Sequence, residues 1–216
     1  MWKALALKEL REAALLAVLA LVAYLYATLV LMGAPLLPGS SYGRAEIPFL
    51  GSTFYLVYAV VAALFAVALG MRQTLGEALG GTYQFLLTRP AGRTALYAKL
   101  AVGTGLYFAI SALPILLYAA WAATPGTHAS PFAWSMTLPA WMLWLGMSLL
   151  YAGAFLSGLR PARWFGTRLL PLAGSVLGTL MIAVEHDVTL VRLLGAVVAA
   201  LLLAAIGFTI RTRDFT

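Results

Sequence analysis

Long apolar stretches alternate with short polar segments along the whole chain. Six such stretches stand out, and none carries a charged residue near its midpoint. An α-helix rises about 1.5 Å per residue, so about 20 apolar residues cross a hydrocarbon core of about 30 Å. The pattern therefore predicts an all-α integral membrane protein with six transmembrane helices. Their expected ranges are about 13–33, 49–71, 96–121, 136–158, 169–184 and 191–210.

The fifth stretch is the shortest of the six. As a helix it rises only about 24 Å, which is less than the hydrocarbon thickness, so we expect a thinned bilayer or an irregular outer end there. It also contains Gly174 and Gly178. This GxxxG spacing lets a neighbouring backbone approach closely. We therefore predict a helix-packing seam at these two glycines, either within the chain or with a second protomer.

The first twelve residues are more polar than the stretch that follows. Apolar and basic residues there occupy different sides of a helix, a pattern typical of a helix that lies on the membrane surface. The same segment can instead serve as a basic anchor for the first span, and the two interpretations are compatible. The apolar side holds Trp2, Ala6 and Leu10, and the basic side holds Lys3, Lys8 and Arg11.

The positions of the basic residues predict the orientation, because Lys and Arg concentrate in cytoplasmic segments. With the N-terminus inside, all of the 14 Lys and Arg residues except Arg44 and Arg192 fall on the cytoplasmic side. Six crossings then return the C-terminus to the same side. The expected location is a cell membrane, plasma or inner, that the chain crosses several times with both termini in the cytoplasm.

The amino-acid composition is also typical of an integral membrane protein. The chain is 63% hydrophobic and 10% charged, whereas soluble domains carry about 25% charged residues. Six spans leave no room for a separate catalytic domain, so we expect residues 1–216 to form a single transmembrane domain. The formal charge of +7 is spread between the spans and forms no continuous patch, which argues against nucleic acid as a partner.

The segment 72–99, between the second and third stretches, is longer than a tight connection. Apolar residues recur in it at helical spacing, an acid stands near the expected amino end and a proline ends the run. A short amphipathic cytoplasmic helix is therefore predicted there. Its apolar positions are Leu75, Leu79, Tyr83 and Leu86, and its end markers are Glu77 and Pro90.

Three consecutive apolar residues of this segment, Phe85, Leu86 and Leu87, stand close to Arg89 and Arg93. An exposed apolar knob with basic neighbours suits docking into the groove of a partner protein. A helix that rests on the inner leaflet, with its arginines on lipid phosphates, explains the same residues. The residues alone leave both interpretations open.

The order of elements and the pattern in this segment resemble the permease subunits of the ABC type 2 exporter family. The resemblance implies that the segment is a coupling helix, which sits in a cleft of a separate ATPase subunit. It covers the whole chain, from the amphipathic start to the short basic tail. The residues that carry it are Glu77, Gly81, Thr82, Leu86, Leu87, Pro90, Arg93 and Lys99. The ATPase-coupling residues that it implies are Glu77, Gly81, Thr82, Phe85, Leu86, Leu87, Arg89, Pro90 and Arg93.

The resemblance implies a dimeric permease that exports an amphipathic or hydrophobic substrate. ATP and Mg²⁺ would bind to the partner ATPase, because this chain contains no phosphate-cradling loop and no arrangement of a nucleophile with a base. Two departures from the family stand out. Gly92 replaces a frequent serine, and only Glu185–Leu190 joins the last two spans, where the family often inserts a re-entrant element. The alternative function is a membrane scaffold or accessory subunit that recruits a cytoplasmic partner without transport.

Aromatic residues of the second span are candidates for a substrate pathway: Phe54, Tyr55 and Tyr58. Tyr107 and Phe108 of the third span are weaker candidates. Aromatic residues that face lipid or the membrane interface are the alternative. The uncharged midpoints of the spans argue against proton-coupled transport and intramembrane catalysis, which place ionisable groups at depth.

No metal site and no cofactor are expected in this chain. It contains no cysteine, so disulfides and thiolate metal sites are excluded. His186 stands between Glu185 and Asp187, but all three fall in one short outer turn, with no ligand from elsewhere to complete a site.

Overall fold

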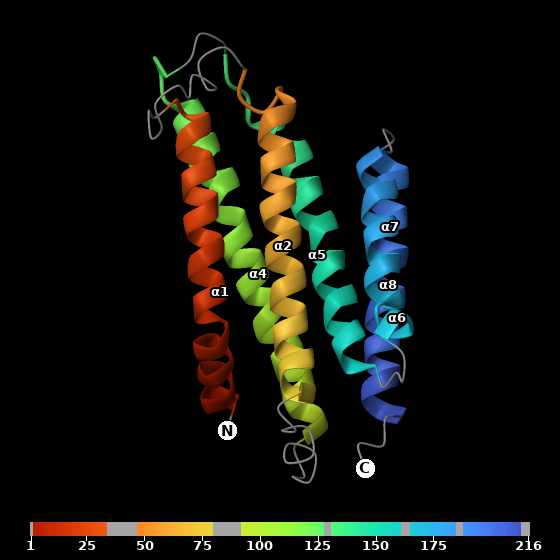
Figure 1. The fold of residues 1–216 in the computed structure, drawn as a ribbon. Helices are drawn as coiled ribbons and strands as arrows, with labels where there is room; N and C mark the ends of the chain where they lie inside the picture. Colours follow the sequence, from red (N-terminus) through yellow and green to blue (C-terminus); the bar gives the residue numbers. More distant parts are fainter. Residues whose placement is uncertain are drawn as a thin grey trace.

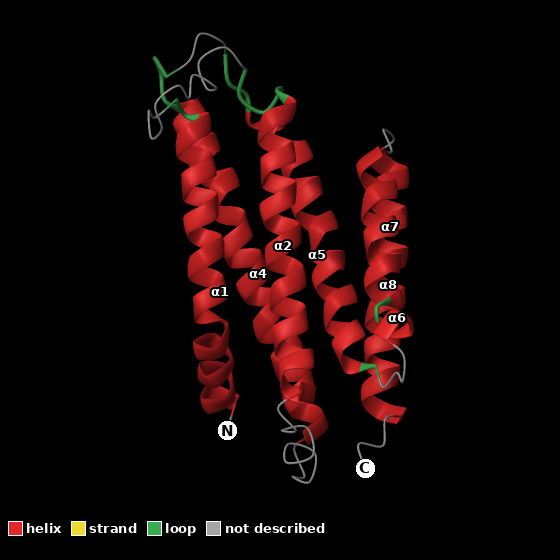
Figure 2. Ribbon diagram, viewed as in Figure 1, coloured by secondary structure: helices red, strands yellow, loops and turns green. Residues whose placement is uncertain are grey.

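A computed structural model describes residues 2–33, 47–79, 92–127, 131–160, 165–184 and 188–212. Within these ranges the regular structure is entirely helical, as Figure 2 shows. The chain runs up and down through one bundle, and its two termini lie at the same end (Figure 1). The helices are α1 (Trp2–Leu31), α2 (Ser52–Leu79), α4 (Gly92–Ala123), the 3₁₀ helix η1 (Trp134–Thr137), α5 (Leu138–Leu159), α6 (Phe165–Arg168), α7 (Leu170–Val184) and α8 (Val188–Thr212).

Five stretches of the described residues are long and apolar enough to cross a membrane. The prediction of an all-helical chain with the character of a membrane protein is therefore confirmed. The fifth expected span, 169–184, corresponds to α7, whose apolar part, Leu170–Ile182, is shorter than the others. The long stretches are Ala6–Leu31, Ser52–Glu77, Thr94–Ala123, Trp134–Leu159 and Thr189–Thr212.

The first helix differs from one of the two interpretations of its start. The sequence allowed a surface helix or a basic anchor for the first span, and α1 is one continuous helix of 30 residues, about 45 Å long. Its polar start packs against the bundle, because Glu9 there is only 2% exposed. One buried stripe runs from this start along the helix at intervals of three or four residues. It holds Glu9, Ala13, Ala17, Ala20, Tyr24, Thr28 and Leu31.

The second and third expected spans are also longer than predicted. α2 continues to Leu79 and α4 begins at Gly92. Glu77 consequently lies near the carboxyl end of α2, so its predicted place near the amino end of a separate helix is wrong. The helix continues because Gln73, Thr74 and Glu77 keep a buried face after the apolar span has ended.

Most of the predicted coupling residues lie outside the described residues. Arg93 stands in the first turn of α4, and nothing is described of its side chain. The predicted positions in the segment 80–91 are Gly81, Thr82, Phe85, Leu86, Leu87, Arg89 and Pro90.

Helix α5 lies at the centre of the bundle and is the most buried of the five long helices. It packs against α2, α4, α7 and α8, while α1 lies on the opposite side of α2 from α7 and α8 (Figure 1). At its carboxyl end, Arg168 donates hydrogen bonds to the backbone oxygens of Ser157 and Gly158. These bonds satisfy carbonyl groups that the end of a helix leaves free.

Small residues bring α2 and α5 into close contact. A Cβ atom built on Gly70 would lie 2.7 Å from the Tyr151 backbone oxygen and 2.9 Å from the Ala154 Cβ. Gly158 of α5 packs equally closely on Thr74 of α2. Such contacts let two backbones approach and increase the packing between membrane helices. This seam was not predicted from the sequence.

The GxxxG glycines of α7 are placed differently from each other. A Cβ on Gly178 would lie 3.3 Å from Val198 of α8, whereas a Cβ on Gly174 would meet nothing within 4 Å. Gly178 therefore contributes to packing within the chain. Gly174 faces outward, where a second protomer or lipid could contact it.

Candidate functional site

A cluster of charged side chains is buried where α1, α2 and α4 meet, at the end of the bundle that holds the N-terminus. Lys99 of α4 is 0% exposed. Its Nζ lies 2.6 Å from Oε1 of Glu9 on α1 and 2.5 Å from Oε1 of Glu77 on α2. One ammonium group thus joins two carboxylates from two other helices.

The cluster continues toward the surface through partly exposed residues. Lys8 Nζ lies 3.5 Å from Oε1 of Glu77 and 3.5 Å from Oε1 of Glu12. The side chains of Lys8 and Glu12 are each about half exposed. Arg72 Nε donates a hydrogen bond of 2.8 Å to the Glu12 backbone oxygen, which adds a second link between α1 and α2.

A layer of neutral hydrogen bonds adjoins the charges and includes α5. Gln73 Nε2 donates to the Lys99 backbone oxygen at 3.1 Å, and Tyr151 Oη donates to Gln73 Oε1 at 2.7 Å. A side chain on Gly103 would collide with both the Tyr151 hydroxyl and the Gln73 amide. The layer therefore requires glycine at this position. The layer connects α2, α4 and α5, and the ion pair of Lys99 with Glu9 adds α1.

The pairing in this cluster is what allows a charged lysine to be buried. The idealised free energy of moving one ammonium-sized ion into a low-dielectric interior is of order 20 kcal/mol, and excellent ion-pair geometry is needed to offset it. Two carboxylates within 2.6 Å of the Lys99 Nζ supply the opposite charge, and the contact with Glu77 is also a hydrogen bond. Ionisable groups buried in membrane helices are usually functional, and this makes the cluster our candidate site.

The carboxylates of Glu9, Glu12 and Glu77 offer oxygens that all lie within 4.8 Å of one another. Such spacing can hold a cation. Here the ammonium groups of Lys8 and Lys99 already approach these oxygens and supply positive charge. The arrangement is therefore suited to joining helices by ion pairs and does not call for a metal.

The cluster contains one of the predicted coupling residues, Glu77, and it flanks the segment 80–91. Glu77 precedes that segment and Lys99 follows it, so their ion pair connects the two helices from which the segment begins and ends. The sequence interpretation singled out both residues but missed Glu9. The sequence did contain an indication of this cluster, because Glu9, Glu77 and Lys99 each stand close to one end of an apolar stretch.

The predicted pathway residues lie elsewhere, toward the opposite end of α2. Phe54 and Tyr58 are buried inside the bundle, at 4% and 3% exposure. Phe54 stacks on Tyr118 of α4, with ring centroids 5.0 Å apart, and on Tyr58. Tyr55 is partly buried and donates a hydrogen bond to the Phe49 backbone oxygen. Phe54 and Tyr58 thus face neighbouring helices and not lipid.

Tyr107 and Phe108 of α4 belong to a second group of aromatic contacts. Tyr107 is completely buried, and its hydroxyl donates to the Trp144 backbone oxygen at 3.1 Å. Trp144 Nε1 in turn donates to Ser111 Oγ. Phe108 packs edge-on against the Trp144 ring. These contacts join α4 to α5 in the interior of the bundle.

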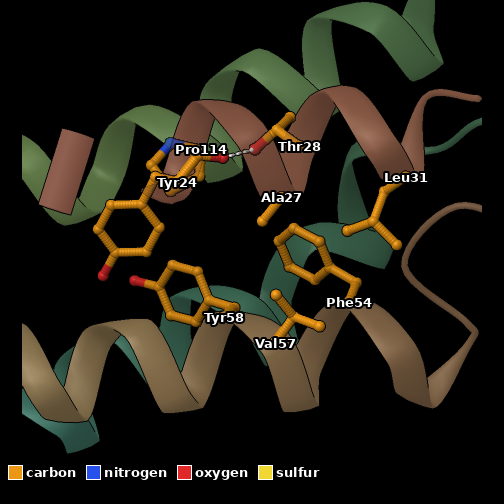
Figure 3. A pocket seen from close by; sticks show the side chains of 8 residues that line it. All are labelled: Tyr24, Ala27, Thr28, Leu31, Phe54, Val57, Tyr58 and Pro114. Atoms are coloured by element: carbon orange, nitrogen blue, oxygen red, sulfur yellow. Dashed lines mark hydrogen bonds between the residues drawn. The ribbon is translucent and has the colours of Figure 1, made fainter. Parts of the chain in front are cut away.

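A small pocket lies beside Phe54 and Tyr58 between α1, α2 and α4. Its cavity volume is only about 10 Å³, close to the space that a single water molecule needs. Figure 3 shows the two hydroxyl groups of Tyr24 and Tyr58 at one end of it and Leu31 at the other. The lining residues are Tyr24, Ala27, Thr28, Leu31, Phe54, Val57, Tyr58 and Pro114.

The fold and the site define an all-helical protein with membrane character and a buried ion cluster at one end of its bundle. Comparison with family models, with curated proteins and with solved structures finds no match to this chain. Function is therefore argued from the residues and their geometry.

Proposed function

We propose that this chain is the membrane-spanning permease subunit of an ATP-binding-cassette transporter, which exports an amphipathic or hydrophobic substrate. A separate ATPase subunit would bind ATP and Mg²⁺ on the cytoplasmic face, and a second permease protomer would complete the pathway. The observation that carries the proposal is the buried Lys99 cluster. It fixes both helices that flank the predicted coupling segment to each other and to α1.

The charge asymmetry of the chain supports a cytoplasmic position for this cluster. In that topology α1, α2, α4, α5, α7 and α8 are the six spans, with α7 crossing a thinned part of the bilayer. Both termini and the segment 80–91 then lie in the cytoplasm. The ion cluster lies at the inner edge of the membrane, directly beside the expected ATPase.

The cluster gives the proposed coupling a mechanism. A displacement of the docked segment would move the carboxyl end of α2 and the amino end of α4 together, because Glu77 and Lys99 are ion-paired. Glu9 would carry that movement to α1, and the Gln73–Tyr151 hydrogen bond would carry it to α5. Hydrogen bonds to charged groups contribute about 1.5–3 kcal/mol each, which is more than neutral ones contribute.

Co-purification and hydrolysis test the proposed function directly. We expect an ATPase subunit to co-purify with the chain in mild detergent. In proteoliposomes, ATP hydrolysis should require this chain and respond to the transported compound. An ATPase that binds the chain but shows no such response would favour the scaffold function. Failure to recover any ATPase would contradict the permease function.

Labelling of single cysteines tests the topology, since the native chain contains no cysteine. Cysteines at Ser40 and Thr127 should react with an impermeant thiol reagent added outside intact cells. A cysteine at Thr88 should react only after the membrane is opened, because Lys and Arg asymmetry places its segment inside. The reverse pattern would exclude the orientation on which the coupling proposal depends.

The substitution Leu86→Glu tests the docking role of the coupling segment. A leucine buried in a partner's cleft contributes about 1.5–3 kcal/mol, and a carboxylate there is destabilising unless it is neutralised or paired. We therefore expect at least about tenfold weaker ATPase binding, measured by pull-down at equal membrane abundance. Gln84→Glu adds the same charge two residues away and serves as the control. Equal recovery of ATPase by Leu86→Glu and wild type would remove Leu86 from the coupling role.

A further inference from the structure

The turn that leads into α2 holds a bulky residue in a backbone conformation that normally suits glycine. The Leu50 N–H donates a hydrogen bond of 3.1 Å to the Ile47 oxygen, which closes a four-residue turn. Pro48 is its second residue, and Phe49, its third, has a φ of 61°. These features define a type II turn, whose third position usually holds glycine or asparagine. The left-handed conformation is unfavourable for phenylalanine, so other contacts must stabilise it here.

The contacts that hold Phe49 come from separate parts of the chain. Its ring is buried, at 3% exposure. The ring centroids of Phe54 on α2 and Tyr118 on α4 both lie 5.0 Å from that of Phe49. The centroid of Phe132, which precedes η1, lies 6.3 Å away. The Tyr55 hydroxyl donates a hydrogen bond of 2.7 Å to the Phe49 backbone oxygen. Together these contacts hold the turn in its unfavourable conformation. We name the four rings the aromatic cluster: Phe49, Phe54, Tyr118 and Phe132.

The aromatic cluster lies where α2 begins, at the end of the bundle opposite the termini (Figure 1). Phe54 also stacks on Tyr58, which stands one helical turn further into the bundle. The Phe49 ring therefore packs on the predicted pathway residues from the bundle end. On the other side of the cluster, Tyr118 follows Pro114 by one turn of α4. A proline removes one helical hydrogen bond, so the end of α4 that carries Tyr118 can bend at this point.

We propose that Phe49 is a latch that closes this end of the bundle. In the closed state its ring packs in the aromatic cluster and the turn is strained. In the released state the ring leaves the cluster and the turn relaxes. The strain opposes the ring contacts, so the two states are closer in free energy than ring burial alone would make them. Strained residues of this kind cluster in switch regions. In a permease the latch would gate the pathway on the side away from the ATPase, and this role alone rests on the proposed function.

Amide hydrogen exchange of the purified full-length chain in lipid nanodiscs measures release of the latch. The Leu50 amide exchanges when its hydrogen bond to Ile47 opens, and mass spectrometry with residue-level fragmentation measures its rate. We expect wild-type Leu50 to exchange at least about tenfold faster than the amides in the middle of α5, because local opening requires no global unfolding. Equal rates would overturn the latch, since the turn would then open only when the whole bundle unfolds.

Two substitutions of Phe49 separate the ring contacts from the strain. Phe49→Ala and Phe49→Gly both remove the ring, but only glycine adopts a positive φ freely. We expect Leu50 exchange to become at least about tenfold faster in Phe49→Ala than in wild type, because the burial of the ring is lost. In Phe49→Gly it should be about tenfold slower than in Phe49→Ala, because the left-handed penalty is absent. Exchange in the middle of α5 should not change in either variant.

Leu50→Ala is the matched control, because it removes an apolar side chain of the same turn that is 64% exposed. Its exchange at position 50, corrected for the intrinsic rate of alanine, should equal that of wild type. The latch is overturned if Phe49→Ala also equals wild type, or if α5 accelerates together with the turn. Equal rates in Phe49→Ala and Phe49→Gly would show that the turn is not strained, and they would overturn it as well. No ATPase takes part in these measurements, so their outcome is separate from that of the permease function.

Discussion

The Lys99→Met variant is expected to lose about 3–5 kcal/mol of the free energy of unfolding, because removing one partner of a buried ion pair leaves the other charges uncompensated. Glu9 and Glu77 would then face each other with no ammonium between them. Lys8 reaches Glu77 only at 3.5 Å and is half exposed. The measurement is thermal or denaturant unfolding of the purified chain in detergent.

Lys8→Met is the matched control for this experiment. It removes a lysine that touches the same carboxylate, and exposed ion pairs contribute only about 0–1 kcal/mol. We expect it to remain close to wild type in stability. If Lys99→Met proved as stable as Lys8→Met, the buried cluster would not hold the helices together, and the coupling mechanism based on it would fail.

A charge-free version of the cluster separates stability from coupling. Buried ion pairs can often be replaced by well-packed hydrophobic residues of similar volume without loss of stability. The triple variant Lys99→Met, Glu9→Met and Glu77→Met should therefore recover much of the stability that Lys99→Met loses. If the cluster transmits movement, ATP hydrolysis by the complex should remain uncoupled from the transported compound. Normal coupling in this variant would show that the charges serve folding alone.

The second large effect is expected for Gly70→Ala at the seam between α2 and α5. The new Cβ would lie 2.7 Å from the Tyr151 backbone oxygen and 2.9 Å from the Phe155 backbone nitrogen. Backbone atoms of a helix cannot move aside separately, so the two helices must part. Overpacking of this kind is destabilising by typically 1–3 kcal/mol. Parting would also pull Gln73 away from Tyr151 and loosen the layer beside Lys99.

Gly174→Ala is expected to increase the free energy of unfolding, the opposite of the effect of Gly70→Ala. Its Cβ would meet nothing within 4 Å, and alanine is favoured over glycine in a helix by about 0.5–1 kcal/mol. The difference in the free energy of unfolding between Gly70→Ala and Gly174→Ala is measured under the same conditions. If Gly70→Ala proved as stable as Gly174→Ala, the close packing of α2 on α5 would be contradicted.

A bulkier substitution, Gly174→Leu, should leave the monomer folded and dissociate a dimer only if the partner protomer packs at this glycine.

The sequence predicted the helical class and the membrane character of the chain, because a helix that crosses lipid needs a long apolar run. It did not predict the helix ends near the charges. A polar residue after an apolar run was interpreted as leaving the membrane, so the buried face of Gln73, Thr74 and Glu77 was not recognised. Their burial depends on α1, α4 and α5, which follow or precede them in separate helices. Glu9 and Lys99 illustrate the same problem, since 90 residues separate the two charges that meet.

The sequence predicted only part of the packing between helices. Gly174 and Gly178 attracted attention because both lie in one short stretch. The closer seam uses Gly70 and Thr74 on α2 together with Ala154 and Gly158 on α5. Each pair has the same four-residue spacing of small side chains and could have been noticed. Which two helices share a seam, however, follows from the three-dimensional arrangement and not from either helix alone.

The burial of Lys99 constrains the order in which the protein can be assembled during synthesis. Glu9 and Glu77 are made before Lys99, and each lies close to an end of its apolar stretch. Membrane helices insert individually before they associate, so these carboxylates can stay hydrated among lipid headgroups until α4 has emerged. Only then can α1, α2 and α4 close around the ammonium group. A nascent chain that ends before α4 therefore lacks the ammonium group that Glu9 and Glu77 share, a feature by which membrane quality control could distinguish an unfinished bundle from a completed one.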